Sequence, residues 1–516
     1  MSYAEGSTVW CKEDGGNVGK QVPQFIEYPF LEEDQTKLES CKTAYDYFKL
    51  FQTDEFVTDI HLESLLYARQ RGFDNLVQHL SVNNLRCVEA VLLFSGYDGP
   101  PHRKMLWQMQ PDSRNKFVAD NIRRDEFDAV LKCLHFRNNS EIDTDGYYKV
   151  RPIFDNLNKG GRFFQHEKEF SVDESMIAYY GKHSSKQFIR GKPIRYGYKV
   201  WTMATSNGAG VRFEPYCGKD TQLEDTGLGL GPNVVLGLVE KAGIKPGSEV
   251  YMDNLFTTFP LLEKLSEKGI GGTGTIRQNR LNKIPIKSKK DMEKKNIPRG
   301  EIDALYKSDQ VLVCWKDNKA VYMGSNQWSE IDGGPSMRWS RDLKKKVGIP
   351  TPQCIKKYNT FMGGVDLLDN MVNCYRVKYR SKKWWWAFYS WSLNVQAVQA
   401  WRLRCRMREE LKSEPLLSFI RELVIEMMNV HGHPPMKRTV TVSGPMRVLD
   451  SSIYDAKNHW PVANRPGKDG KPVRRNCKQC YDMHKKESRS SYQCSKCMVS
   501  LHLPECFTAC IHFILS

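Results

Sequence analysis

Residues 249–258 read EVYMDNLFTT, a short apolar strand that runs into an aspartate and then directly into the start of a helix. A carboxylate at the end of a buried strand is costly unless it is paired or holds a cation. Taken alone, Asp253 is better explained as a cap of the following helix. For Asp253 to be a metal ligand instead, other carboxylates must lie close to it in the folded protein.

The segments around this stretch alternate between strand and helix patterns. Before it, residues 169–181, 196–205 and 210–218 are rich in β-branched and aromatic residues and are separated by turn formers, which predicts three successive antiparallel strands. Later segments continue as helix, strand, helix, strand, at 232–243, 248–254, 257–269 and 270–277, with glycine ending each helix. This is the element order of a ribonuclease-H-like α/β sheet.

The rest of the chain divides around that sheet. Apolar residues recur at helical spacing on both sides of it, and a charge run with two further strand-like pieces interrupts it. The predicted organisation is a disordered tail at 1–35, the first part of a helical domain at 36–165, a ribonuclease-H-like catalytic domain at 166–277, an insertion domain (an inserted lobe) at 278–360, the helix of a third aspartate at 361–375, the second part of the helical domain at 376–455, a basic linker at 456–475 and a cysteine-rich zinc-binding domain at 476–516.

Composition narrows the class of protein. The chain has 516 residues, of which 40% are hydrophobic, so it can bury large cores. Its formal net charge of +17 suits a polyanionic partner such as nucleic acid, although solubility alone also explains such a charge. We see no apolar run long enough to span a membrane and no signal peptide at Met1, so we expect no membrane partner and a cytosolic or nuclear protein.

Further carboxylates lie where they would meet Asp253 in such a sheet. Asp173 is in the first predicted strand, and Asp366 follows two glycines at the start of a helical pattern, with Asp369 on the same helix face. Each alone can be a cap or a surface residue; three in this element order favour a site. Hard oxygen ligands suit Mg²⁺ or Mn²⁺, and two such ions can activate a water or a 3′-hydroxyl in phosphodiester chemistry. We expect Asp173, Asp253 and Asp366 to bind the metal.

Three blocks of sequence carry a resemblance to a known family. Residues 172–201, 250–280 and 358–371 resemble the three catalytic blocks of the piggyBac family of DNA transposases and their domesticated derivatives. Residues 51–70 and 147–158 resemble the helical region of that family. The likeness covers nearly everything after residue 40.

The resemblance implies cut-and-paste transposition through hairpin intermediates at TTAA sites, performed by a homodimer on double-stranded DNA at transposon ends and targets. It assigns catalysis to Asp173, Asp253 and Asp366, with Asp369 as an accessory acidic position. The helical domain would then serve dimerisation and DNA binding, and the protein would act in the nucleus. The alternative is a domesticated DNA- or chromatin-binding protein that keeps the scaffold without needing the chemistry. A general nuclease would leave the cysteine-rich and helical domains unexplained.

Two basic stretches lie beside these blocks. Residues 371–408 hold nine Lys or Arg, five Trp and no acidic residue. Basic side chains neutralise phosphates, and tryptophan can stack on an unpaired base. Trp391 and Trp401 are better explained as core residues, whereas Trp384 matches the family tryptophan near the active site; solvated surface charge is the alternative for the basic residues. The predicted DNA-binding residues are Lys182, Lys186, Arg190, Lys192, Arg195, Arg376, Arg380, Lys382, Lys383 and Trp384.

Six of the 15 cysteines lie in the last 40 residues, among them two CxxC pairs. Two such pairs indicate zinc, because each clasps one edge of a tetrahedron, and so short a segment with few apolar residues needs metal to fold. Disulfides are the less probable alternative in a reducing compartment. We expect two Zn²⁺ ions in an interleaved cross-brace of the kind found at the family's C-terminus, a module that binds DNA, a partner subunit or a histone tail. The predicted ligands are Cys477, Cys480, Cys494, Cys497, His502, Cys506, Cys510 and His512, with His484, Cys510 and His512 competing for the last positions.

Overall fold

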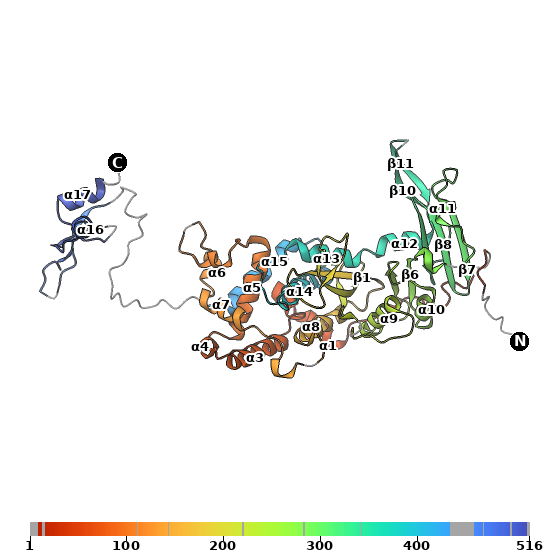
Figure 1. Ribbon diagram of the computed structural model, residues 1–516, viewed down its shortest axis with the longest axis horizontal. Helices are drawn as coiled ribbons and strands as arrows, with labels where there is room; N and C mark the ends of the chain where they lie inside the picture. Colours follow the sequence, from red (N-terminus) through yellow and green to blue (C-terminus); the bar gives the residue numbers. More distant parts are fainter. Residues whose placement is uncertain are drawn as a thin grey trace. The chain divides into compact units, whose positions relative to one another are not determined.

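The chain folds into two compact units, Met1–Pro435 and Met436–Ser516 (Figure 1). The computed structural model describes residues 9–12, 16–110, 112–142, 144–218, 221–281, 284–341, 343–433, 459–467, 469–495 and 498–512. None of the helices within these ranges is both long enough and apolar enough to cross a membrane.

A nine-stranded sheet organises the first unit (Figure 1). Its order is β2-β3-β1-β5-β6-β9-β8-β7, with β4 also paired to β3. Strand β1 runs antiparallel to β3 and parallel to β5, and β5 runs parallel to β6. The strands are β1 Glu169–Ala178, β2 Gln187–Phe188, β3 Tyr196–Thr205, β4 Gly210–Pro215, β5 Glu249–Met252, β6 Gly271–Thr275, β7 Ile302–Lys307, β8 Gln310–Lys316 and β9 Ala320–Ser325.

The predicted succession of three antiparallel strands, helix, strand, helix and strand is confirmed. Helix α9 (Leu230–Ala242) ends at Gly243, whose φ of 64° is the left-handed conformation that glycine adopts without a Cβ penalty. Helix α10 (Phe259–Glu267) begins with proline in its first turn and is capped by Thr258. The pattern analysis missed β2, because a two-residue strand carries no period of its own.

The segment predicted as an insertion domain extends this sheet. Strand β9 pairs antiparallel with β6, and β8 and β7 follow outward, so these strands do not form a sheet of their own. Strands β10 (Pro335–Ser340) and β11 (Lys345–Pro350) make a separate hairpin. Helix α11 (Lys289–Met292) contributes the buried Met292 to a local core beside β8 and β9.

The predicted helical domain comes from both sides of the sheet sequence. Helix α14 is buried along most of its length and packs against α2, α5 and α8 from the earlier part and against α13 and β1. The helices are α1 Glu32–Ser40, α2 Ala44–Lys49, α3 Asp54–Gln70, α4 Asp74–Val77, α5 Val82–Asp98, α6 Lys116–Ala119, α7 Arg124–Cys133, α8 Arg151–Gly160, α12 Gln353–Phe361, α13 Gly364–Cys374, α14 Trp386–Met407 and α15 Leu416–His431, with 3₁₀ turns at Arg103–Trp107, Asn139–Glu141, Tyr148–Val150, Gly161–Phe163, Gln278–Arg280 and Glu409–Leu411.

A buried polar network ties the two sequence halves of this helical body together. The Arg86 guanidinium on α5 donates to Asp54 Oδ1 (2.7 Å) and to Glu89 Oε2 (3.3 Å). From α14, the Tyr389 hydroxyl donates to Glu89 Oε1 at 2.9 Å. A buried ion pair is costly to break from one side, so the network fixes how α14 sits on α3 and α5.

The described part of the segment predicted as a disordered tail makes specific contacts. Cys11 exchanges backbone hydrogen bonds with Tyr306 on the outer strand β7, and the Lys12 ammonium lies 2.9 Å from Asp303 Oδ1. Further along, Gly19 N donates to Asn326 O (3.0 Å). The described residues of this segment are therefore attached to the sheet by specific contacts, which weak periodicity does not reveal.

The second unit is small and irregular. Strand β12 (Pro461–Ala463) pairs with β15 (Tyr492–Cys494), and β13 (Arg475–Asn476) pairs with β14 (Arg489–Ser490); its helices are α16 (Lys478–His484) and α17 (Glu505–His512). The unit thus incorporates part of the segment predicted as a linker. Buried Asn464 explains this, because its Nδ2 donates to Val473 O and Ser490 O.

A glycine in the first unit provides a test of the packing. A Cβ at Gly364 on α13 would lie 2.2 Å from the Thr205 carbonyl oxygen and 2.6 Å from Ser171 Oγ, whereas one at Gly363 would meet nothing within 4 Å. We expect Gly364→Ala to lower the free energy of unfolding by about 1–3 kcal/mol, as overpacking does. Urea unfolding of the full chain measures this, with Gly363→Ala as the control. Equal midpoints for both variants would contradict the close packing.

Candidate active site and metal centre

The pairing of β1 with β5 places two aspartates side by side. In this parallel register Val172 lies opposite Met252, and each is followed directly by an aspartate, Asp173 and Asp253. Asp173 lies within β1 and Asp253 directly follows β5, so the two residues are neighbours at the end of this parallel pairing. Sequence analysis predicted this adjacency from the element order.

Helix α13 brings in the remaining acidic residues. It packs on β1 and β3, and its Val365 N donates to Ser171 Oγ at 3.1 Å. Asp366 lies in the first turn of α13 and is exposed, and Asp369 follows one turn later and is half-buried. Burial raises the pKa of Asp369 to about 7, with smaller contributions in the same direction from the charges of Asp366 and Asp173. The four predicted aspartates therefore share one electrostatic environment.

The pKa values of Asp173 and Asp253 are raised by burial and by neighbouring negative charge as well. Burial raises the pKa of Asp173 to about 7, and the charge of its neighbour Glu174 adds to this. Burial also raises the pKa of Asp253, and the charge of Asp173 acts in the same direction. Glu174, which the sequence analysis did not single out, is thus a fifth acidic residue of the cluster. Its signal was its adjacency to Asp173 in VDESM.

Lys192 forms ion pairs with two acidic residues of this cluster. Its Nζ lies 3.7 Å from Asp173 Oδ2 and 3.9 Å from Glu174 Oε1. Burial acts to lower the pKa of Lys192, but the charges of Asp173, Glu174, Asp366 and Asp369 outweigh burial and raise it. Lys192 was predicted to contact DNA; in this structure its ammonium faces the aspartates.

The capping alternative for Asp253 is only partly correct. The cap of α10 is Thr258, whose Oγ1 accepts from Leu261 N at 3.2 Å. Asp253 Oδ1 accepts instead from Leu255 N at 2.7 Å, which closes the turn after β5. The charge of Asp173 nevertheless acts on the Asp253 carboxylate and contributes to its raised pKa. These partly buried carboxylates, whose charges act on one another, have the donor chemistry that hard divalent cations require.

The basic loop after β1 carries most of its predicted DNA-binding residues on the surface. Lys182, Arg190 and Arg195 are exposed, and the Lys186 ammonium donates to Gly181 O at 2.8 Å. Trp384 lies at the base of this loop. Its ring centroid is 4.6 Å from that of His183, and it belongs to an aromatic cluster with Tyr147, Tyr198 and Phe388.

The second basic stretch divides into exposed and internal residues. Arg376, Arg380 and Lys382 are exposed. The Lys383 ammonium donates to Lys132 O (2.9 Å) and Leu131 O (3.3 Å), the last carbonyls of α7, so it stabilises the end of that helix. Arg380 and Lys382 line a surface hollow of about 460 Å³ together with Arg103 and Lys132. Trp391 is buried in the core, as expected, and Trp401 donates from Nε1 to Glu414 O.

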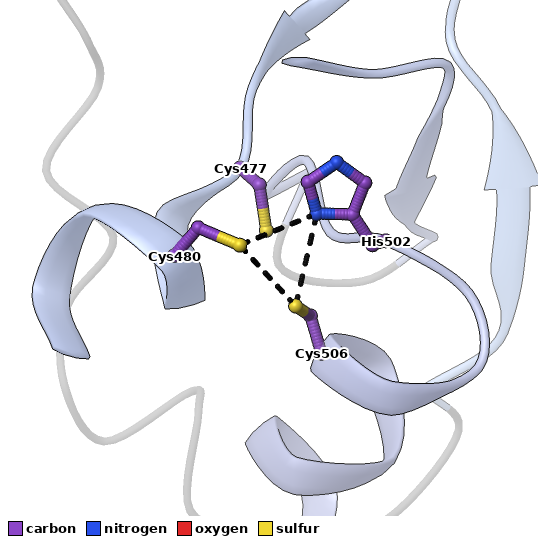
Figure 2. A group of neighbouring side chains, drawn as sticks. All are labelled: Cys477, Cys480, His502 and Cys506. Atoms are coloured by element: carbon purple, nitrogen blue, oxygen red, sulfur yellow. Dashed lines mark hydrogen bonds between the residues drawn. The ribbon is translucent and has the colours of Figure 1, made fainter. Parts of the chain in front are cut away.

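The second unit assembles one complete metal-ligating cluster. The ligand atoms of Cys477, Cys480, His502 and Cys506 all lie within 4.8 Å of one another (Figure 2). His502 Nδ1 is 3.4 Å from Cys480 Sγ and 3.7 Å from Cys506 Sγ, and the two sulfurs are 3.6 Å apart. These are close to the edges of a zinc tetrahedron, about 3.6 Å for N···S and about 3.8 Å for S···S at usual bond lengths.

The surroundings of this cluster fix its histidine. The Ser488 hydroxyl lies 3.3 Å from His502 Nε2, which leaves Nδ1 toward the sulfurs. His484, the competing candidate, is exposed at the end of α16 and is not a member of the cluster. Four of the predicted zinc ligands are therefore brought together, from the first CxxC pair and from the later His502 and Cys506.

The remaining predicted zinc ligands are only partly described. Cys494 is buried at the end of β15, Cys497 lies outside the described residues, and the side chains of Cys510 and His512 do so as well. The sequence analysis missed His459, whose Nδ1 lies 3.2 Å from Cys494 Sγ. No motif could have found it, because it lies 35 residues before Cys494 with no CxxC-type spacing.

Comparison with known proteins places the chain in a family. Residues 43–401 match the family described as Transposase IS4. Human PiggyBac transposable element-derived protein 3 is 35% identical over 469 residues, 90% of this chain and 75% of that protein. Human PiggyBac transposable element-derived protein 2 is 33% identical over 425 residues, 80% and 69% of the two chains.

Among solved structures, the piggyBac transposase in a synaptic complex with hairpin DNA shares the fold, with a TM-score of 0.65 at 19% identity over 90% of this chain and 95% of that one. The structural match shows a shared fold. The sequence matches to the family and to the two human proteins cover enough of this chain to assign it to a family. The chain belongs to the piggyBac family of transposases and transposase-derived proteins.

Proposed function

We propose that the protein is a cut-and-paste DNA transposase of piggyBac type, which cleaves and joins DNA strands at TTAA sites with Asp173, Asp253 and Asp366 as metal ligands. The observation that supports the proposal is that Asp173 and Asp253 directly follow paired residues of β1 and β5, while α13, which carries Asp366, packs on β1. The order of the first strands, β4-β3-β1-β5-β6, supports a ribonuclease-H-like catalytic domain.

The carboxylates would hold two Mg²⁺ or Mn²⁺ ions. When bound, such ions would activate a water or a 3′-hydroxyl as the nucleophile and stabilise the leaving oxygen of a phosphodiester. Asp369 and Glu174 lie beside these ligands and keep the site strongly negative. Lys192 neutralises part of that charge in the free protein, and cation binding would release its ammonium toward the DNA phosphates.

The partners follow from the same site and its surroundings. The exposed basic loop after β1 and the exposed Arg376, Arg380 and Lys382 suit contacts with the phosphates of double-stranded DNA. Trp384 at the base of the loop would handle the unpaired or hairpinned nucleotides. The solved relative is a transposase in a synaptic complex with hairpin DNA, which supports DNA as the partner. A homodimer and action in the nucleus belong to the same proposal.

The zinc-binding unit completes the proposed architecture. Cys477, Cys480, His502 and Cys506 would hold one Zn²⁺ ion, and Cys494 with Cys497 a second, with Cys510 or His512 as further candidates. Because ligands of the first ion flank Cys494 in sequence, the two sites would interleave as a cross-brace. The module would bind transposon ends or the partner subunit.

A second function has a specific observation in its favour. The human relatives are named as transposable element-derived proteins, which suits a domesticated DNA- or chromatin-binding protein that keeps the scaffold without using its chemistry. The mutually interacting carboxylates of this protein favour the catalytic proposal. The two differ in one measurable respect, strand cleavage.

The catalytic role of Asp253 is tested by separating cleavage from binding. We expect Asp253→Ala to abolish cleavage of transposon-end DNA with Mg²⁺, because a metal ligand is lost, while DNA affinity in Ca²⁺ stays within a few-fold of the wild type. The control is Asp59→Asn, at an exposed position on α3. Equal loss of binding and cleavage would make Asp253 structural, and cleavage that persists in Asp253→Ala would remove it from the metal site.

The role of Lys192 is tested through metal binding. Without its ammonium the carboxylates repel one another more strongly and meet one competing cation fewer, so we expect Lys192→Gln to lower the melting temperature of the metal-free protein. We also expect Mg²⁺ to raise that temperature more than in the wild type. Lys182→Gln, at an exposed position in the same loop, is the control. The same Mg²⁺-induced shift in both variants would contradict the assignment.

The zinc cluster is tested by removing one ligand. We expect Cys480→Ser to lose the structure of the second unit and with it at least one Zn²⁺ ion per chain, with weaker DNA binding and unchanged unfolding of the first unit. Zinc analysis and limited proteolysis measure these effects, and Cys374→Ser, at an exposed position in the first unit, is the control. Unchanged DNA affinity in a zinc-depleted Cys480→Ser protein would assign the module to a protein partner.

A further inference from the structure

His459 stands next to the one described thiol of the second CxxC pair. Its Nδ1 is 3.2 Å from Cys494 Sγ. In the complete cluster of the same unit, the corresponding contact between His502 Nδ1 and Cys480 Sγ is 3.4 Å. Both are close to the N···S edge of a zinc tetrahedron, about 3.6 Å, with the His459 edge the more compressed.

The backbone holds His459 in this place. The strand that follows it, β12, pairs with β15 so that Pro461 lies opposite Cys494. Trp460 N donates to Ser495 Oγ (3.1 Å), and Ser495 N donates back to Trp460 O (2.8 Å). The contact between imidazole and thiol therefore rests on a two-strand pairing and does not depend on side-chain rotation alone.

Backbone hydrogen bonds join Cys494 to residues that follow it shortly in the sequence. Cys494 N donates to Val499 O (2.9 Å), and Met498 N donates to Cys494 O (2.9 Å), so the chain reverses directly after the cysteine. Met498 has a φ of 57°, the left-handed conformation that such a tight reversal requires. Cys494 itself is buried, at 3% exposure, with an imidazole as its close polar neighbour.

We propose that His459 is a zinc ligand that shares its ion with Cys494. The proposal rests on the second zinc ion of the proposed function and gives it a ligand from outside the cysteine-rich segment. It follows that the zinc-binding unit includes residue 459 and that the segment predicted as a linker contributes to the metal site. With an imidazole ligand here, the second zinc ion needs fewer ligands from the C-terminal candidates Cys510 and His512.

The test measures zinc in the full-length protein. Wild type, His459→Ala and the control His484→Ala, which removes an exposed histidine of the same unit, are loaded with zinc and titrated with a competing chelator. We expect two ions per chain in the wild type and in His484→Ala. In His459→Ala one of the two ions should be lost at a chelator concentration at least about tenfold lower, since even weaker perturbations of a zinc site cost 10–100-fold in affinity.

A conservative variant separates ligation from folding. We expect His459→Cys to retain both ions and, in the cobalt-substituted protein, to add thiolate-to-metal charge-transfer absorption. A histidine with a purely structural role would not produce that change.

Two results would overturn the assignment in distinguishable ways. Chelator titrations of His459→Ala that match His484→Ala, with two ions bound in each, would remove His459 as a ligand and leave the second zinc site in place. One ion per chain in the wild type would remove the second site itself, and His459 with it.

Discussion

The close approach of helix α13 to strands β1 and β3 is the constraint on which the candidate active site depends. Gly364 lies so near the Thr205 carbonyl and the Ser171 hydroxyl that no side chain fits between them, and the same hydroxyl accepts from Val365 N. This contact sets the height of α13 above the sheet. Asp366 and Asp369 follow within two turns of α13. Because Gly364 has no Cβ, the helix can approach the sheet closely, and this approach determines how far these aspartates lie from Asp173.

Much of this arrangement could be predicted from the sequence, because it depends on local patterns and on one topological rule. Strand and helix periods gave β1, β3, β4, β5 and β6 in order, and two parallel strands next to each other must bring the residues after them to one edge. The glycine pair before Asp366 indicated a helix start at a tight place. The resemblance to a family then assigned the residues, and the structure pairs β1 with β5 and packs α13 on β1.

What the sequence could not show depends on contacts between distant segments. Strand β9 carries an ordinary strand pattern, and nothing in that pattern says that its partner is β6. Lys383 and Lys382 are neighbours with the same chemistry, yet one is held by the carbonyls at the end of α7 and the other is exposed. Charge runs predict a basic surface; which of its members face outward is decided by the packing behind them.

The second unit shows how such contacts can also decide where a domain begins. The buried core that the structure describes there consists of Cys477, Cys494, Leu501 and Phe507, so half of its members are expected zinc ligands. With so little apolar surface, metal binding and folding must be a single event. Any segment that adds a ligand is then part of the folding unit whatever its composition. The pairing of β12 with β15 brings His459 to Cys494, and a stretch with the composition of a linker becomes the first strand of a metal-dependent domain.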